Sequence, residues 1–338
     1  MDKLAAVERV SKSIVRVLGL NPGPFTLQGT NTYIVGHGDR RVLIDTGDGA
    51  QPEYFSLLKK SLGSGRIDRI ILTHWHADHI GGVSRLLDSA DIVTPNCAVY
   101  KRKDATIDSQ ETVTRLLASA AKRGRLFDIA DAQVFDVEGL RLRAVYTPGH
   151  TDDHMALTVD GEQVGEGQQN DMDAGPLLLT GDLILGQGTT IVHSLQPYMA
   201  SLERVLGIRP SALLPGHGPV ISGRSRGSDG EERPNSIRVI EGYIEHRNMR
   251  ERQILAVLGR PPPSSPPRSR GWLVREITSE VYPDITDPKI VLAAQNNTRL
   301  HLHKLLAEGK AQRIASGGGD GDGGGDDLEL WVLVKQKI

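Results

Sequence analysis

The segment Ile71–Gly82 reads ILTHWHADHIGG and constrains the fold of this chain more than any other stretch. Three histidines and one aspartate occur within the six positions from His74 to His79, directly after an apolar run typical of a buried strand. Imidazole nitrogens and carboxylate oxygens are ligands of divalent transition metals. The crowding therefore predicts a strand that ends in a metal-binding loop.

Further candidate ligands occur at other predicted strand ends. His150 in TPGHTDDH, Asp182 in LLLTGD and His217 in LLPGHG each follow an apolar run and adjoin a glycine, which permits close backbone approach. Four ligands would already fill one tetrahedral site, so the number of candidates favours two metal ions over one. The predicted ligands are His74, His76, Asp78, His79, His150, Asp182 and His217.

The rest of the first two thirds of the chain alternates between short strands and helices. Residues 14–45 read as successive antiparallel strands, and residues 52–62 place apolar side chains at helical spacing before the strand at 69–73. This order predicts a mixed α/β fold. Four segments rich in Gly, Ser or Pro are too polar to pack and are expected to be exposed loops: residues 161–175, 222–234, 259–271 and 316–327.

A second domain is predicted at the C-terminal end. A long helical stretch, Ile237–Leu258, is followed by two more helical segments and then by two strands that flank the Gly/Asp-rich loop. Helices followed by a β-hairpin are typical of a winged helix, with the loop at the wing tip. We therefore predict a catalytic domain over residues 1–225 and a winged-helix-like domain over residues 236–338.

Composition narrows the partners and the compartment. The 338 residues include 40 Lys and Arg and 42 Asp and Glu, so any nucleic-acid contact would need a local basic patch. The single cysteine excludes a disulfide within the chain and favours a reducing compartment. No apolar run approaches the ~18 residues of a membrane span, and the N-terminal stretch lacks a secretory signal. We expect no membrane contact and a location in the cytoplasm or the mitochondrial matrix.

The metal motifs, in this order, resemble the signature of the metallo-β-lactamase superfamily of hydrolases, THxHxDH followed by a His, a bridging Asp and a last His. This resemblance implies an αββα sandwich. It also implies that Asp45, in LIDTG, supports the site loop rather than binding metal. The resemblance divides the ligands between two metals: His74, His76 and His150 bind one, Asp78, His79 and His217 bind the other, and Asp182 bridges both.

Such a pair of metals would perform hydrolysis. Two divalent ions about 3.5–4 Å apart share a water, lower its pKa and clamp an oxygen of the substrate. We therefore expect metal-bound hydroxide as the nucleophile, with Asp78 as a catalytic residue that also orients it. Redox-inert Zn²⁺ suits this chemistry, so two Zn²⁺ ions are expected, although Mn²⁺ or Fe would suit the same ligand types.

Longer stretches narrow the substrate. NPGPFTLQGTNTYIVG, TPGHTDDHMAL, GDLILGQGTT and YIEHRNMRERQIL resemble the beta-lactamase-like protein 2 group, whose animal members are single-strand-specific endoribonucleases. The resemblance covers nearly the whole chain except the four loops and residues 101–122, and it implies single-stranded RNA as substrate. Fungal thioesterases that release polyketides from acyl carrier proteins share LQGTNTY, THxHxDH and GHTxDHM, so an acyl carrier protein thioester is the alternative substrate.

Two other functions fit less well. A glyoxalase II-type thioesterase would have the same metal site, but the winged-helix-like tail disfavours it. A non-catalytic winged-helix module with a vestigial metal domain would be expected to have lost at least one of the seven ligands, and all seven are present.

Candidate substrate contacts follow from the RNA hypothesis. Basic residues lie on about two turns of the long helix, near enough to one another to meet phosphates. The wing loop is acidic and aromatic residues make up only 4% of the chain, so the grip on RNA would be local and electrostatic. The candidate contacts on the helix are His246, Arg247 and Arg250. Asn31, in the family stretch LQGTNTY, and Thr151, directly after His150, are further candidates.

Overall fold

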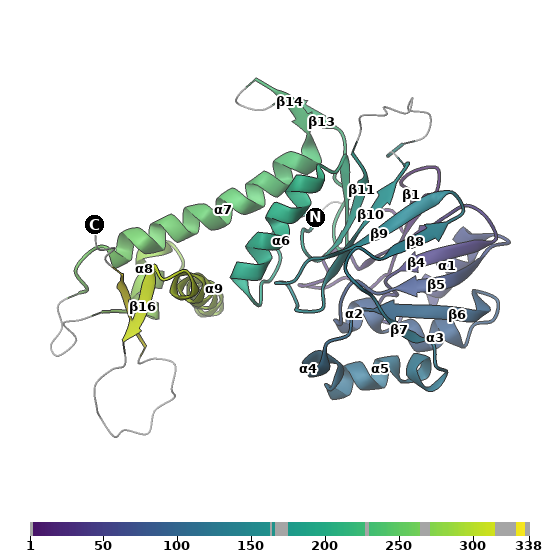
Figure 1. Ribbon diagram of the computed structural model, residues 1–338, viewed down its shortest axis with the longest axis horizontal. Coiled ribbons are helices and arrows are strands. Elements are labelled where there is room, and N and C mark those ends of the chain that lie inside the picture. Colours follow the sequence, from purple (N-terminus) through teal and green to yellow (C-terminus); the bar gives the residue numbers. More distant parts are fainter. Residues whose placement is uncertain are drawn as a thin grey trace. The chain divides into compact units, whose positions relative to one another are not determined.

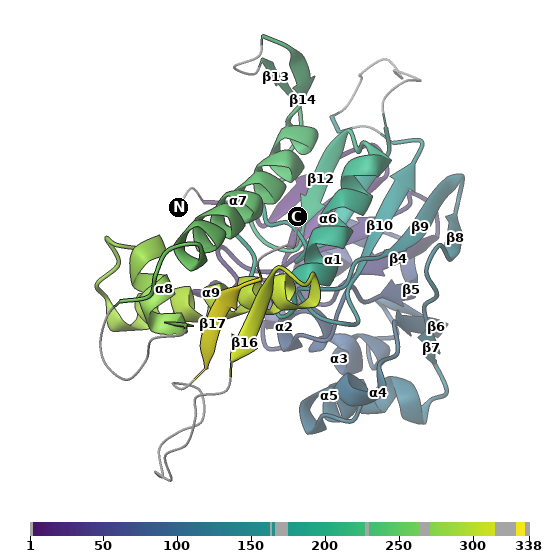
Figure 2. The same cartoon turned by 60° about the vertical axis from the view of Figure 1, so that its left-hand side comes forward.

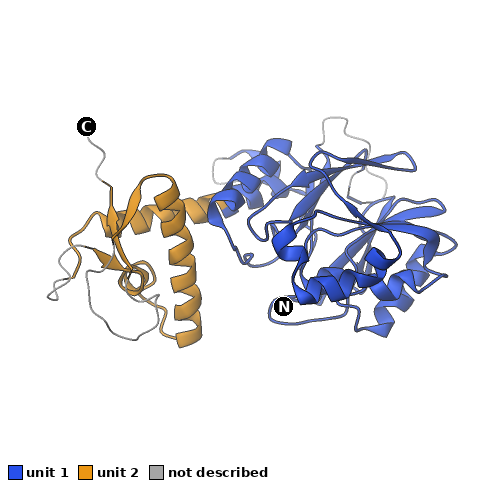
Figure 3. Cartoon of the chain, turned by 60° about the horizontal axis from the view of Figure 1, so that its bottom comes forward, with its two compact units in different colours: residues 1–243 blue, residues 244–338 orange. Residues whose placement is uncertain are grey.

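The chain forms two compact units, residues 1–243 and 244–338, shown in different colours in Figure 3. The computed structural model describes residues 3–162, 164–165, 175–226, 230–263, 271–314 and 329–334. The boundary between the units lies within one long helix, α7 (Asn235–Leu258). The helix that the sequence assigns to the C-terminal domain therefore belongs in part to each unit. None of the described helices is both long enough and apolar enough to cross a membrane.

Unit 1 contains a seven-stranded sheet whose strands lie in chain order (Figure 1). The first four strands pair antiparallel, as predicted for residues 14–45, and the last four pair parallel. The strands are β1 (Val7–Arg9), β2 (Ile14–Leu18), β3 (Asn31–Val35), β4 (Arg40–Ile44), β5 (Arg66–Ile71), β6 (Val93–Lys101) and β7 (Leu126–Asp128).

The second sheet of unit 1 has five strands in the order β12-β11-β10-β9-β8. All neighbours pair antiparallel except β11 and β12, which are parallel. The strands are β8 (Val134–Val137), β9 (Leu140–Tyr146), β10 (Met155–Asp160), β11 (Leu177–Gly181) and β12 (Ala212–Pro215).

Helices cover the outer faces of both sheets (Figures 1 and 2). Side chains alternate across a strand, so Val15 and Val17 of β2 pack with the helices on one face, whereas Ile14 packs between the sheets. The helices are α1 (Pro52–Leu62), α2 (Ala77–Ile80), α3 (Val83–Leu87), α4 (Ala105–Asp108), α5 (Glu111–Lys122) and, on the second sheet, α6 (Leu195–Ile208). This arrangement confirms the expected αββα sandwich.

Unit 2 has the winged-helix arrangement that the sequence predicts. A three-stranded sheet, in the order β15-β17-β16, packs with two helices and the C-terminal part of α7 around one apolar core that includes Ile254, Ile277, Leu302 and Trp331. The remaining elements are β15 (Trp272–Leu273), α8 (Val274–Val281), α9 (Pro288–Ala307), β16 (Ala311–Ile314) and β17 (Leu330–Leu333).

Two segments differ from the sequence expectation. The described residues among 222–234 are exposed or half-buried, and they contain a hairpin of β13 (Arg224–Arg226) and β14 (Glu232–Pro234). Residues 101–122, which the resemblance left out, include α4 and the amphipathic α5. The predicted wing loop at 316–327 lies outside the described residues, as do most of the predicted loops at 161–175 and 259–271.

A buried ion pair joins the first sheet to the loop after His150. The Lys101 ammonium, at the end of β6, lies 2.9 Å from Asp153 Oδ2 and 2.7 Å from Asp108 Oδ1. The side chains of Lys101 and Asp153 are 2% and 0% exposed. Burial raises the pKa of the Asp153 carboxyl, and the Lys101 charge opposes that rise. Because water reaches neither charge, each is stabilised mainly by the opposite charge beside it.

We predict that Lys101→Met destabilises unit 1 by about 3–5 kcal/mol because it leaves the Asp153 carboxylate buried without its counter-charge. The double variant Lys101→Met/Asp153→Asn, which removes both charges, should regain part of that loss. Denaturant unfolding of the single and double variants measures both effects. Equal loss of stability in the two variants would show that the ion pair does not couple these residues.

A second prediction concerns His301 of α9, which is fully buried in unit 2. Burial, together with Arg247 and Lys304, lowers the pKa of His301 to about 3. The unfolded chain therefore takes up a proton as the pH falls below about 6.5, whereas the folded unit does not, and stability is lost in that direction. Between pH 7.5 and 5 the wild type should lose about 1–2 kcal/mol more than His301→Leu. Fluorescence of the core residues Trp272 and Trp331 can follow the unfolding.

Candidate metal centre

The candidate ligands lie at the ends of strands from both sheets. The THWHADH run directly follows β5 and continues into α2. His150, Asp182 and His217 follow β9, β11 and β12. Glycine makes this convergence possible at Gly216, where an added Cβ would lie 2.5 Å from Asp182 Oδ1 and 3.0 Å from His79 Cε1. All seven side chains fall into two groups that could each hold a metal ion.

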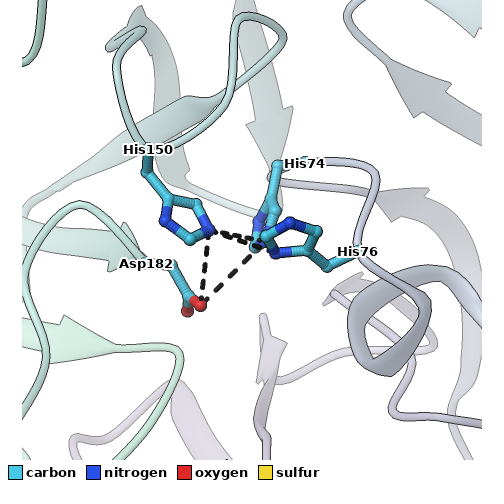
Figure 4. Close-up of side chains that lie close together, drawn as sticks. All are labelled: His74, His76, His150 and Asp182. Atoms are coloured by element: carbon cyan, nitrogen blue, oxygen red, sulfur yellow. Dashed lines mark hydrogen bonds and ion pairs between the residues drawn. The ribbon is translucent and has the colours of Figure 1, made fainter. Parts of the chain in front are cut away.

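The first group contains three histidines and one aspartate (Figure 4). His74 Nε2 lies 2.9 Å from His76 Nδ1, and His150 Nε2 lies 3.3 Å and 3.1 Å from these two atoms. Asp182 Oδ2 lies 3.7 Å from His150 Nε2 and 4.0 Å from His74 Nε2. Four donor atoms therefore face a common point.

The second group contains Asp78, His79 and His217. The two Nε2 atoms lie 3.3 Å apart, and Asp78 Oδ2 lies 3.3 Å from each of them. Asp182 also reaches this group, with Oδ2 3.3 Å from His217 Nε2 and Oδ1 3.5 Å from His79 Nε2. The Asp182 carboxylate is therefore shared between the groups.

Hydrogen bonds on the far side of the rings set the tautomers. His150 Nδ1 donates to the Ile191 carbonyl at 2.7 Å, and His79 Nδ1 donates to Asp45 Oδ2 at 2.8 Å. Because Nδ1 carries the hydrogen in each ring, the Nε2 lone pair points into the group. Asp45 thus supports the site without entering either group, as the sequence resemblance implies.

Asp45 orients a histidine of the first group as well. Its carboxylate accepts the Thr73 hydroxyl at 2.9 Å and the Thr73 N–H at 2.8 Å. With its hydrogen used in this way, the Thr73 oxygen accepts from His74 Nδ1 at 3.0 Å. Asp45 itself adopts a left-handed φ of 59°, which is unfavourable for a residue with a Cβ. One strained carboxylate therefore holds a histidine of each group.

This donor set fits divalent cations. Several imidazole lone pairs face one another at hydrogen-bond distance, an arrangement that is repulsive unless a positive charge lies between them. Asp182 Oδ1 is buried and has no hydrogen-bond partner in the described part of the chain. Bound metal ions would satisfy both the nitrogens and this oxygen.

Burial and the neighbouring charges act differently on the two groups. Burial, helped by His150 and His79, lowers the pKa of His76 to about 3. Burial also opposes the protonation of His217, but Asp182 and Asp78 outweigh it and raise the pKa of His217 to about 9. The carboxylates therefore draw positive charge to the second group, where a metal would displace protons.

Only part of the site can meet solvent. His76 and Asp78 are half-buried, whereas the other five candidate ligands are buried. Asp78 Oδ2 also accepts the Thr30 hydroxyl at 2.9 Å. Burial opposes ionisation of Asp78, but His79 and His217 hold its pKa well below the usual range. A charged carboxylate thus lies on the accessible side of the site.

Two of the predicted substrate contacts, Asn31 and Thr151, are buried. Asn31 is 1% exposed and donates to the carbonyls of Pro215 and Gly218, on either side of His217. Thr151 is also 1% exposed, and its hydroxyl donates to Asp153. Because both side chains are covered and bonded within the protein, the structure favours a role for each in shaping a ligand loop.

The basic residues predicted to bind RNA do not share one exposed face of α7. Arg247 is 5% exposed, and Arg250 donates to the Val281 carbonyl while its guanidinium lies 4.0 Å from the centre of the Tyr282 ring. His246 is exposed. Arg247 is therefore covered and Arg250 is bonded within unit 2, and phosphate binding by these residues stays a prediction.

Thr30 and Ile191 were not foreseen as contributors to the site. Thr30 acts through its hydroxyl and Ile191 through its backbone carbonyl, and a carbonyl has no signal in a sequence. His154 is not a predicted ligand, but its Nε2 accepts the Asp182 N–H at 3.1 Å. This hydrogen bond fixes the backbone of Asp182, whose carboxylate is shared between the two groups.

We predict that Asp45→Asn weakens metal binding by about 10–100-fold, the usual effect of losing a group that orients a ligand. The asparagine amide is neutral and has only one acceptor oxygen, so it cannot accept all the hydrogen bonds that the Asp45 carboxylate accepts from His79 and Thr73. The test measures the metal content and metal affinity of Asp45→Asn. The control is Asp136→Asn, the same substitution at an exposed aspartate away from the metal centre. Unchanged affinity in Asp45→Asn would show that the histidines are oriented without it.

Comparisons with known proteins identify the family. Residues 25–165 match the Metallo-beta-lactamase superfamily, and residues 274–320 match the Beta-lactamase associated winged helix domain. A Beta-lactamase-like protein 2 homolog from Drosophila melanogaster is 39% identical, over 92% of this chain and 93% of that protein. An Atrochrysone carboxyl ACP thioesterase from Claviceps purpurea is 36% identical, over 92% of this chain and 85% of that protein.

Solved structures share the fold. A Beta-lactamase domain protein from Burkholderia ambifaria superposes with a TM-score of 0.69 at 18% identity, covering 98% of this chain and 96% of that one. A metallo-beta-lactamase family protein from Thermus thermophilus gives a TM-score of 0.58 at 19% identity, covering 98% and 99%. From its ligand motifs, its fold and these relatives, the chain belongs to the metallo-β-lactamase superfamily of hydrolases and carries the associated winged helix domain.

Proposed function

We propose that this chain is a dinuclear metal-dependent hydrolase that cleaves single-stranded RNA. The observation that carries the proposal is the position of Asp182. Its carboxylate lies within 4.0 Å of His74 and His150 in one group and within 3.5 Å of His79 and His217 in the other. A carboxylate shared in this way suits a pair of neighbouring cations, here two Zn²⁺, with Mn²⁺ or Fe as other candidates.

His74, His76 and His150 would hold one ion, and Asp78, His79 and His217 the other. When bound, such a pair lowers the pKa of a water and polarises an oxygen of the substrate. Asp78 is the candidate catalytic residue. Its Oδ2 is held by Thr30, and its charged carboxylate lies on the accessible side of the site, where it can orient the attacking water by accepting a hydrogen bond.

The assignment of RNA rests on similarity beyond the metal ligands. The stretches that resemble the endoribonuclease group include residues that metal binding does not require, such as NPGPF near the N-terminal end and HRNMR in the middle of α7. In the structure Asn31 shapes the site, since it bonds to the loop that carries His217. Arg247 and Arg250 of α7 lend no electrostatic support, because Arg247 is buried and Arg250 donates to the Val281 carbonyl.

A thioesterase is the second candidate. The Claviceps purpurea relative is named an Atrochrysone carboxyl ACP thioesterase, and its identity of 36% is close to the 39% of the Drosophila melanogaster relative. The same shared carboxylate and the same Asp78 would serve hydrolysis of an acyl carrier protein thioester. Substrate assays must therefore separate the two.

The experiment offers the purified protein labelled single-stranded RNA, the same RNA as a duplex, and an acyl pantetheine thioester. We expect cleavage of the single strand, loss of that activity after chelation, and recovery on adding Zn²⁺ or Mn²⁺. Asp78→Asn and His79→Ala should each lower the rate by about 10²-fold or more. The exposed-site variant Asp91→Asn is the matched control and should keep full activity.

Thioester turnover without RNA cleavage would support the thioesterase and overturn the RNA assignment. Cleavage that survives chelation and both variants would point to a contaminating nuclease.

A further inference from the structure

The loop of residues 183–191 contacts three candidate ligands. It begins directly after Asp182 and ends at Ile191, whose carbonyl accepts from His150 Nδ1 at 2.7 Å. Midway, the Gly186 N–H donates to the carbonyl of His217 at 2.8 Å. The loop contains no helix or strand. Side chains that fix the position of this loop therefore also affect the position of the candidate ligands.

Tyr243 holds the middle of this loop from α7. Its hydroxyl accepts the Leu185 N–H at 3.2 Å and donates to the Gly188 carbonyl at 3.0 Å. One oxygen thus ties together two points of the backbone on the way from Asp182 to Ile191. Gly188 adopts a left-handed φ of 78° in this arrangement, a conformation that glycine accepts without strain.

The beginning of the loop has a second support, which lies in the core. The Tyr198 hydroxyl, from α6, donates to the Leu183 carbonyl at 2.8 Å. Tyr198 is fully buried and packs so closely on Gly149 that a Cβ added there would lie 2.4 Å away. Tyr243 is half-buried, and its hydroxyl can be removed with less disturbance of the core.

We propose that the Tyr243 hydroxyl is a positioning group for the metal centre. By fixing the 183–191 loop, it keeps the Ile191 carbonyl in line with His150 Nδ1. That hydrogen bond keeps the hydrogen on Nδ1 and the Nε2 lone pair facing His74 and His76. Tyr243 acts on the ligands through the loop. The inference rests on the proposed metal-dependent function.

The test compares full-length wild type with Tyr243→Phe, which loses only the hydroxyl. Competition with a chromophoric chelator gives the number of Zn²⁺ ions bound and the affinity for each. We expect Tyr243→Phe to bind one of the ions about five- to tenfold more weakly, the effect of losing one hydrogen bond that orients a ligand. Amide hydrogen exchange should be faster in residues 183–191.

A second variant, Gly188→Ala, disturbs the backbone of the 183–191 loop directly. The added methyl group meets nothing within 4 Å, so the variant strains only the left-handed conformation. It should weaken the same ion. Gly63→Ala is its matched control, because Gly63 is also left-handed, with open space around it, at the end of α1. Tyr282→Phe, which loses a hydroxyl bonded to Asn297 in unit 2, is the control for Tyr243→Phe.

The outcomes separate this inference from the proposed function. If wild type binds no metal, the proposed function fails and the inference fails with it. If wild type binds two ions and Tyr243→Phe binds both equally well, only the inference is overturned. Equal weakening in Tyr282→Phe would likewise overturn it, because the effect would then follow from general loss of stability.

Discussion

The structure depends on bringing several imidazole lone pairs to within about 3 Å of one another. Such an arrangement is repulsive by itself, and the protein maintains it with hydrogen bonds on the outer side of the rings. Asp45 has the largest share, since it orients His79 directly and His74 through Thr73. Its left-handed backbone is strain of the kind that functional sites retain.

The ligand motifs and the layer order could be predicted because both are local signals. Apolar runs that end in histidine or aspartate mark strand ends, and strands that end at the same edge of a sandwich bring those residues together. The helix α5 was missed because its segment carries none of the family motifs. Its buried residues Val113, Leu117 and Ala120 nevertheless have helical spacing. The supports from Ile191 and Tyr243 act through backbone contacts that only the folded chain defines.

Arg247 and Arg250 of α7 show how neighbours in sequence can be mistaken for neighbours on a surface. Arg247 lies on the same stripe of the helix as Ile244, Glu251 and Ile254, at intervals of three and four residues, and all four are buried. Arg250, three residues after Arg247 and four before Ile254, borders that stripe, is half-buried and stacks on Tyr282. The periodicity of the helix, applied to every residue type rather than to apolar ones alone, places both arginines on or beside the buried face.

Gly216 is a position at which this sequence cannot accept a side chain. It has no side chain to offer a metal and carries no charge, yet a methyl group there would overlap the shared carboxylate of Asp182 and press on His79. The first glycine of PGHG is therefore as intolerant of replacement as the histidine beside it. Inactive descendants of such a gene could retain all seven ligands and differ at this one position.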